Sequence, residues 1–147
     1  MKGQLFHQIP SWVPSGSRFH IRIRIESNSN ILLTDSQIGQ DVLTAADFCH
    51  TQHKWFVHLL LLMPDHLHAI IAFPPGSNMS RVVGEWKSYL RKAYGIRWQK
   101  NYFDHRLRDE KEFIEKAYYI RMNPVRAGLA ARSEDWNWVI EHKESWG

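Results

Sequence analysis

The chain has 147 residues, of which 44% are hydrophobic, and a formal net charge of +4; this length suits one domain whose core needs no disulfide or metal ion to fold. Its longest apolar stretch, which begins at Phe56, is too short to cross a bilayer, and the amino-terminal residues lack a signal-peptide pattern, so we expect a soluble, cytoplasmic protein with no membrane partner. The single cysteine, Cys49, excludes an intrachain disulfide, a CxxC redox motif and a cysteine-based zinc site.

The first two predicted elements are a strand and a helix. Polar and apolar side chains alternate along residues 18–26, which predicts a strand with its apolar side chains on one face. Residues 35–51 predict a helix, because apolar residues recur at helical spacing after Asp35 and Ser36, either of which can cap a helix amino-terminus.

Two strands follow this helix. Residues 54–63 and 66–73 are nearly all apolar, which predicts central strands that are covered on both faces. Pro64 and Asp65 lie between them and suit a tight turn. We therefore expect these strands to pair with each other.

The second half predicts two amphipathic helices and one more strand. Residues 79–94 form the first helix, with Gly95 as its carboxy-terminal cap. Residues 95–107 are expected to form a strand, and residues 109–122 a helix that ends before Pro124. The expected buried stripe of the first helix consists of Val82, Trp86, Tyr89, Leu90 and Ala93. The resulting order indicates an α+β fold with helices packed on a mainly antiparallel sheet.

Positive charge is concentrated in the second half of the chain. The first 75 residues hold five Lys or Arg and five Asp or Glu, whereas residues 76–147 hold fourteen and ten. Cations alternate with aromatic rings along residues 81–108, which is typical of a surface that binds single-stranded nucleic acid; a solvated basic face over core aromatics is the alternative. The candidate DNA-binding residues are Arg81, Lys87, Arg91, Lys92, Arg97, Trp98, Lys100, Arg106 and Arg108.

His66 and His68 open the second central strand. Side chains two residues apart on a strand point to the same face, so the two imidazoles are expected to converge. Such a pair can hold a divalent metal ion, although an incidental or structural pair is the alternative. Their position in an otherwise apolar strand favours the metal site, because buried imidazoles need partners.

Tyr119 and Asn123 form the second candidate constellation. They lie four residues apart on the polar face of the predicted helix 109–122, whereas Tyr118 is expected to lie nearer the core boundary and to pack there. A tyrosine attacks a phosphodiester more readily when a divalent cation polarises the phosphate. The alternative is a surface tyrosine that leans on a neighbouring loop.

Four segments resemble one known family. Together they are similar to the REP-associated tyrosine transposases of bacteria, which belong to the HUH single-tyrosine transposases and are related to small insertion-sequence transposases. Four ordered motifs over roughly residues 18–130 are more specific than any one of them. The segments are "MPDHLHAII" (63–71), "WKSYLRK" (86–92), "WQKNYFDHRLRDE" (98–110) and "YIRMNPVRAGL" (119–129).

This resemblance implies a fold and a site. The fold is an RRM-like (ferredoxin-like) catalytic core, here one domain over residues 1–147 with a Trp-containing tail from about residue 130. The implied site holds a divalent ion, Mg²⁺ or Mn²⁺, on His66, His68 and Asn123, with Tyr119 as the nucleophile. Asp65 departs from the family, because many relatives have Asn there.

The resemblance also implies a reaction. The substrate is single-stranded DNA with a short hairpin, and attack by Tyr119 forms a 5′-phosphotyrosine link and frees a 3′-hydroxyl. A second 3′-hydroxyl can reverse the step without ATP, which makes the protein a DNA transposase that acts as a monomer or a homodimer.

Two other functions stay open at this point. A protein of the same fold could bind hairpin DNA without cleaving it, in which case a metal ion would be dispensable for binding. An RRM-like RNA-binding protein is the second alternative, but the chain lacks an RNP-type aromatic strand motif. The presence of His66, His68, Tyr119 and Asn123 together favours the enzyme.

Overall fold

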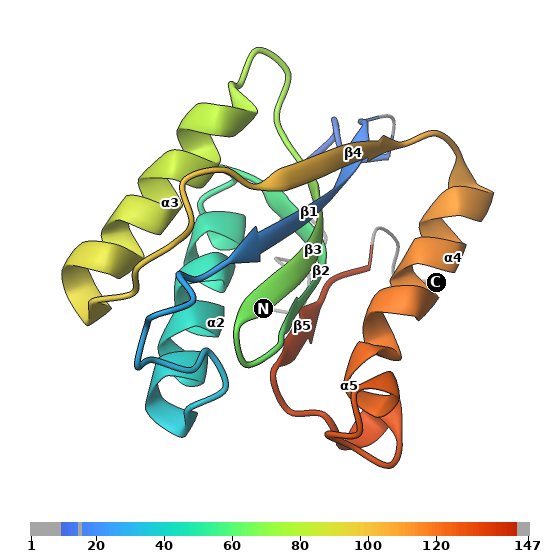
Figure 1. Ribbon diagram of the computed structural model, residues 1–147. Coiled ribbons are helices and arrows are strands. Elements are labelled where there is room, and N and C mark those ends of the chain that lie inside the picture. Colours follow the sequence, from blue (N-terminus) through green and yellow to red (C-terminus); the bar gives the residue numbers. More distant parts are fainter. Residues whose placement is uncertain (1–9, 15, 144–147) are drawn as a thin grey trace, which may run out of the picture.

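The computed structural model describes residues 10–14 and 16–143. The described strands and helices are interspersed along the chain (Figure 1). The strands are β1 (Arg18–Arg24), β2 (Phe56–Leu62), β3 (His66–Ala72), β4 (Phe103–Leu107) and β5 (Val139–Glu141). The helices are α2 (Ser36–Thr51), α3 (Met79–Tyr94), α4 (Glu110–Arg121) and α5 (Asn123–Arg126), followed by a 3-10 turn at Ser133–Asp135.

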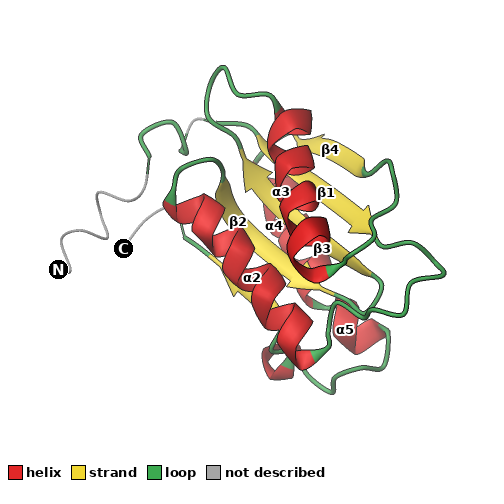
Figure 2. Ribbon diagram, turned by 90° about the vertical axis from the view of Figure 1, so that its left-hand side faces the viewer, coloured by secondary structure: helices red, strands yellow, loops and turns green. Residues whose placement is uncertain are grey.

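The strands form one sheet in the order β4-β1-β3-β2-β5. Every neighbouring pair is antiparallel. Helices α2 and α3 cover one face of this sheet, and α4 covers the other (Figures 1 and 2). The predicted α+β fold, with a ferredoxin-like antiparallel sheet and packed helices, is therefore confirmed, and β5 extends it at one edge.

The alternation of β1 explains the larger part of the core. Its isoleucines are buried toward α2 and α3, and they meet Val42 and Ala46 of α2 there. Every residue of β2 is buried, and β3 is buried after its first residue. This fits the prediction that the two apolar runs form central strands covered on both faces.

Local signals set two of the helix ends as the sequence predicted. The Asp35 side chain accepts hydrogen bonds from the backbone N–H groups of Gln37 and Ile38 and caps α2. Gly95 ends α3 at a φ of 76°, where its N–H donates to the Arg91 carbonyl oxygen. Glycine adopts this left-handed conformation without a steric penalty.

The predicted buried stripe of α3 is partly wrong. Trp86 and Leu90 are buried as expected, and Val83 completes the stripe in place of Val82. Tyr89 is 53% exposed, and Ala93 is also exposed. The core-facing side is centred on positions 83, 86 and 90, which lie three and four residues apart, and position 89 is rotated by about 100° from position 90.

The predicted strand 95–107 is also too long, because only its last five residues form β4. Ile96 and Trp98 are buried, so the preceding segment has a strand-like alternation. Its one bridge joins Trp98 to Ile25. Around this bridge the Glu26 N–H donates to the Arg97 carbonyl oxygen and the Gln99 N–H to the Arg24 carbonyl oxygen, both at 2.8 Å. The Trp98 indole N–H donates to the Lys87 carbonyl oxygen at 3.1 Å, so a single bridge and a buried ring fix this segment rather than a continuous strand ladder.

The end of α4 differs in one residue from the prediction. The helix ends at Arg121, as Pro124 suggested, but Asn123 is not extended and instead begins α5. A proline in the first turn of a helix is tolerated because the N–H that it lacks would have no partner there.

The Trp-containing tail joins the sheet within the described residues. The Trp136 indole N–H donates to the Leu62 carbonyl oxygen at 2.9 Å, and the Leu62 N–H donates to the Trp138 carbonyl oxygen at 2.8 Å. These bonds bring β5 to the edge of β2. Trp146 lies outside the described residues. No helix in the described part of the chain is long and apolar enough to cross a membrane.

Candidate functional site

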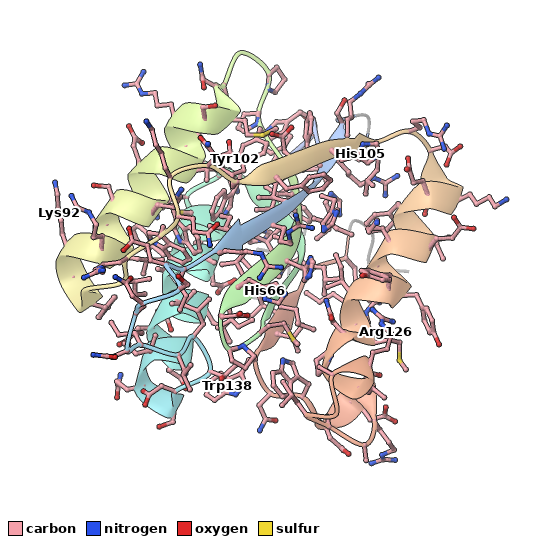
Figure 3. All side chains as sticks on the ribbon, viewed as in Figure 1. His66, Lys92, Tyr102, His105, Arg126 and Trp138 are labelled. Atoms are coloured by element: carbon pink, nitrogen blue, oxygen red, sulfur yellow. The ribbon has the colours of Figure 1, made fainter. Side chains whose placement is uncertain are left out.

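The face of the sheet under α4 carries the two predicted imidazoles. His66 and His68 pair with Arg24 and Arg22 of β1 in the antiparallel register, so these four side chains share one face. The His66 and His68 ring centres lie 5.0 Å apart, with the ring planes at 81°. Figure 3 shows His66 between β1 and the α4–α5 segment. The predicted convergence of the imidazoles is confirmed.

Each imidazole makes a hydrogen bond through Nδ1. The Nδ1 of His66 lies 2.7 Å from Oδ1 of Asp65, and this bond is the main cause that lowers the pKa of the Asp65 carboxyl. The Nδ1 of His68 lies 3.0 Å from Nε2 of His20. Both bonds engage Nδ1, so a ligand of either ring would have to bind at Nε2.

Burial keeps His68 neutral at physiological pH. Only 4% of the residue is exposed, and this burial lowers the pKa of His68 from 6.5 to about 3. The nearby His66, His20, Arg22 and Arg24 act in the same direction, because a positive charge disfavours a second one. Neutral imidazole is the form that binds metal ions.

The imidazole pair fits a divalent metal ion. Their ring centres lie 5.0 Å apart on one face of the sheet, and neutral imidazole nitrogens are common ligands of divalent ions. Among residues 10–14 and 16–143, no group of three or more His, Cys, Asp or Glu side chains could hold an ion. The remaining donors would therefore be oxygens from an amide, water or a phosphate, which suit Mg²⁺ and Mn²⁺.

Tyr119 lies beside this pair. Its ring centre is 6.5 Å from that of His68, with the planes at 89°, and the residue is 47% exposed. The guanidinium carbon of Arg126 lies 4.2 Å from the Tyr119 ring centre, and Nζ of Lys116 lies 5.1 Å from it. Arg126 also donates to the Tyr119 carbonyl oxygen at 2.6 Å. Two cations thus hold the ring from α4 and α5.

Tyr118 was expected to lie near the core boundary, and this prediction is wrong. It is 62% exposed, more than Tyr119. The fully buried residues of α4 are Ala117 and Ile120, so the buried stripe is too narrow to reach position 118. The tyrosine whose ring contacts His68 is Tyr119.

Asn123 lies four residues after Tyr119 in the sequence, which is about one turn of a helix. It is half-buried and begins α5, the short helix that Arg126 fastens to Tyr119. The structure therefore brings His66, His68 and Tyr119 together. The role of Asn123 as a metal ligand stays a prediction.

The candidate DNA-binding residues of segment 81–108 lie mostly away from the imidazoles. Arg91 and Lys92 are exposed on α3, on the other side of the sheet, and Figure 3 shows Lys92 far from His66. Three other cations of the segment are engaged in ion pairs. These pairs are Arg81–Glu85 at 3.3 Å, Arg97–Glu26 at 2.9 Å and Arg108–Glu112 at 3.3 Å.

Trp98 does not fit its predicted role in base stacking. It is 8% exposed, and its ring packs 5.8 Å from that of Trp86. A ring that is enclosed in this way cannot accept a base on its face. The alternation of cations and aromatics arises here partly from core residues, as the alternative interpretation stated.

Part of the basic segment does enclose a hollow. This hollow has a volume of about 300 Å³ and lies between α3 and the loop that follows it. Lys87 donates to the carbonyl oxygens of Gln99 and Lys100 across it, and burial lowers the pKa of Lys87. The lining residues are Gly84, Lys87, Ser88, Arg91, Trp98, Gln99 and Lys100.

A second hollow, of about 520 Å³, lies between α2 and α3 and is lined by Phe48 and Tyr89 among others. It also lies on the side away from the imidazoles.

Three residues of β1 that face the site were not predicted from the sequence. Arg22 and Arg24 lie beside the imidazoles through the strand register, and the Arg22 guanidinium carbon stacks 4.9 Å from the Phe103 ring centre. The third residue is His20, which reaches His68 through the same pairing of β1 with β3. The available signal was the polar face of the alternating segment 18–26, which is opposite to its isoleucines.

Comparisons with known proteins agree with this fold. Residues 15–123 match the family described as "Transposase IS200 like". The REP-associated tyrosine transposase of Escherichia coli (strain K12) is 28% identical over 91 residues, which cover 60% of this chain and 55% of that protein. A putative REP-associated tyrosine transposase of Haemophilus influenzae is 22% identical over 102 residues, 58% of each chain. The chain thus spans little more than half the length of these relatives.

Two solved structures share the fold. A REP-associated tyrosine transposase bound to a REP hairpin has a TM-score of 0.73 at 24% identity, and the match covers 84% of this chain and 76% of that one. A putative transposase from Deinococcus radiodurans has a TM-score of 0.51 at 15% identity, over 69% of this chain and 87% of that one.

Proposed function

The chain belongs to the IS200-like transposase family, and we propose that it cleaves and rejoins single-stranded DNA beside short hairpins through a 5′-phosphotyrosine intermediate. The observation that carries the proposal is the position of Tyr119, whose ring meets that of His68 at 6.5 Å on the face where the two imidazoles converge. The names of the relatives and of the hairpin-bound structure support the choice of substrate.

The chemical step uses the Tyr119 hydroxyl as the nucleophile. Its oxygen attacks the phosphorus of the scissile phosphodiester, the bond from phosphorus to the 3′ oxygen breaks, and the phenol proton leaves to solvent. The 3′ oxygen takes up a proton and departs as a hydroxyl, while the 5′ side stays linked to Tyr119. A second 3′-hydroxyl can attack this link and restore a phosphodiester, because one ester bond replaces another in each step.

The residues around Tyr119 position the reacting groups. Arg126 holds the phenol ring by stacking and by its bond to the Tyr119 carbonyl oxygen, which reduces the rotational freedom of the nucleophile. His66 and His68, with Asn123, would hold the divalent ion. When bound, that ion would polarise the phosphate and stabilise the negative charge of the transition state.

The bound DNA is expected to contact two groups of cations. Arg22 and Arg24 lie beside the imidazoles and would hold phosphates next to the scissile bond. Arg91 and Lys100 line the hollow behind α3 and would hold phosphates farther along the strand or in the hairpin stem. Contacts of this kind raise affinity for any sequence.

The proposal is tested by the formation of a covalent protein–DNA adduct. Hairpin oligonucleotides copied from repeats that flank the gene are labelled at the 3′ end, since the protein would retain that fragment. After incubation with Mn²⁺ or Mg²⁺, a denaturing gel should show labelled protein with the wild type. The Tyr119→Phe variant and samples with EDTA should show none.

Two kinds of gel distinguish the proposed enzyme from a protein of the same fold that binds hairpins without cleaving them. Native gel shifts with the same oligonucleotides report binding, and the denaturing gel reports covalent attachment. Binding to hairpins without any adduct, at every metal ion tried, would contradict the proposed reaction and leave a non-catalytic binder.

A further inference from the structure

His20 is a buried histidine that none of the roles above uses. It lies on β1, only 4% exposed, and its Nε2 is 3.0 Å from Nδ1 of His68. The two rings are nearly parallel, at 18°, with centres 5.3 Å apart. The edge of Phe103 from β4 packs against His20, with ring centres at 5.5 Å, so its orientation is fixed from both neighbouring strands.

A nitrogen pair at this distance must share one hydrogen. Two ring nitrogens without a hydrogen between them would repel each other through their lone pairs. Both histidines are only 4% exposed, and burial favours the neutral imidazole. Each neutral ring carries a single N–H. The shared hydrogen therefore belongs either to His20 Nε2 or to His68 Nδ1.

These two arrangements differ in what His68 offers to a metal ion. If His20 donates, the hydrogen of His68 is on Nε2, and this nitrogen has no lone pair for a ligand. If His68 donates from Nδ1, its Nε2 lone pair is free. Only the second arrangement lets His68 act with His66 on one ion.

We propose that His20 is a positioning residue for the metal pair: it accepts the Nδ1 hydrogen of His68 and holds this ring with its Nε2 lone pair directed to a divalent ion. This inference rests on the proposed function, because it presumes that His66 and His68 bind the ion. His20 does not itself touch the ion or the DNA in this account.

The surroundings explain why an imidazole serves as the acceptor. His66 has a carboxylate partner, Asp65, that is exposed, whereas the site behind His68 is buried. A buried carboxylate would need charged partners to offset its desolvation, but a neutral imidazole nitrogen accepts the same hydrogen at a smaller cost.

The first test measures Mn²⁺ affinity without DNA, through the electron paramagnetic resonance signal of free Mn²⁺. His20→Leu removes the acceptor and should weaken binding by about 10- to 100-fold, the range found when partners of metal ligands are removed. His20→Gln retains an acceptor oxygen and should bind within about threefold of the wild type, by the same reasoning. His105→Leu is the matched control, because His105 lies opposite His20 on β4 and bonds to Glu112.

The second test reads the tautomer directly and does not depend on a variant that folds. Nitrogen-15 NMR of the Mg²⁺-loaded wild type should show the His68 hydrogen on Nδ1. Unchanged Mn²⁺ affinity in a folded His20→Leu variant would overturn the role of His20 and leave the metal pair intact. A hydrogen on His68 Nε2 in the loaded protein, or a wild type that binds no Mn²⁺, would instead overturn the pair, and the role of His20 with it.

Discussion

The two faces of the sheet differ in what they contain, although the same strands build both. Toward α2 and α3, β1 contributes isoleucines to a continuous apolar core. Toward α4, the same strand contributes His20, Arg22 and Arg24, and the covering helix carries a half-exposed tyrosine. Because neighbouring residues of a strand point to opposite faces, one strand can stabilise the fold and build a site. Substitutions in the apolar core of the first face should therefore change stability, and those of the imidazoles and arginines on the second should change binding and cleavage.

The largest expected effect is the loss of cleavage when an imidazole on the α4 face is removed. His66→Ala or His68→Ala should lower the rate of adduct formation by at least about 1000-fold, because a two-imidazole site that loses one ligand also loses the charge that stabilises the transition state. Hairpin affinity should remain mostly intact, because it arises chiefly from phosphate contacts elsewhere. Gel shifts and adduct yields on the same samples check both points. Full activity in either variant would remove the metal pair from the account.

The next effect concerns the opposite face. Leu60 is fully buried in the core under α2 and α3, and Leu60→Ala should lower the free energy of unfolding by about 3 kcal/mol, as expected when a buried leucine leaves a cavity. Urea denaturation measures this change, with the exposed Leu32→Ala as the control. Adduct formation per folded molecule should not change. A loss of cleavage without a loss of stability would show that the two faces are not separate in function.

Two pairs of cations, one on each side of the sheet, allow their contributions to DNA binding to be compared. Replacing Arg91 and Lys92 by alanine, or Arg22 and Arg24 by alanine, should each weaken single-strand binding roughly tenfold at low salt and flatten its salt dependence by up to about one unit of slope per lost phosphate contact. For the α3 pair, saturating DNA should restore cleavage. For the β1 pair, cleavage should stay slow at saturation, because these side chains lie beside the imidazoles. An unchanged salt slope in either double variant would exclude that pair from the DNA-binding surface.

The smallest effect is the acid sensitivity of the α4 side. Burial lowers the pKa of His58 to about 3, and Arg18, His50 and His142 act in the same direction; Phe113 of α4 packs against its ring. As the pH falls below 6.5, the unfolded chain binds a proton at this residue and the folded chain does not. The free energy of unfolding should therefore decrease between pH 6.5 and about 3, by on the order of 1 kcal/mol at pH 5.5 from this one group. Urea denaturation at pH 7.0 and 5.5 should show a smaller decrease in His58→Phe than in the wild type. An equal decrease would assign the acid sensitivity to other groups.

Local patterns in the sequence were enough to predict most of the fold. The alternation of residues 18–26, the apolar runs of β2 and β3, and the caps at Asp35 and Gly95 all depend on neighbouring residues, and the structure confirms each of them. The prediction for the segment before β4 was wrong. Ile96 and Trp98 alternate like strand residues and are buried, but the segment forms one isolated bridge and no continuous ladder. A pattern of burial does not by itself show which backbone groups are paired.

The site was predictable only where its residues are close in the chain. His66 and His68 converge because they are two residues apart on one strand. His20 lies 48 residues from its partner His68, and the position of Arg22 beside the imidazoles depends on the same β1–β3 register. Arg126 meets Tyr119, seven residues before it, because α5 follows α4 directly and the chain stays helical beyond the point where Pro124 predicted an end. The sequence does not state such registers and continuations, so these residues could be found only in the structure.

The identity of the attacking residue tests the central claim most directly. The wild type is incubated with hairpin DNA and Mn²⁺, the adduct is trapped and digested, and mass spectrometry locates the phosphotyrosine. The account predicts that it maps to Tyr119, that Tyr119→Phe forms no adduct while it still folds and binds DNA, and that Tyr118→Phe forms the adduct as the wild type does. A phosphotyrosine at position 118, or cleavage that persists in Tyr119→Phe, would contradict it.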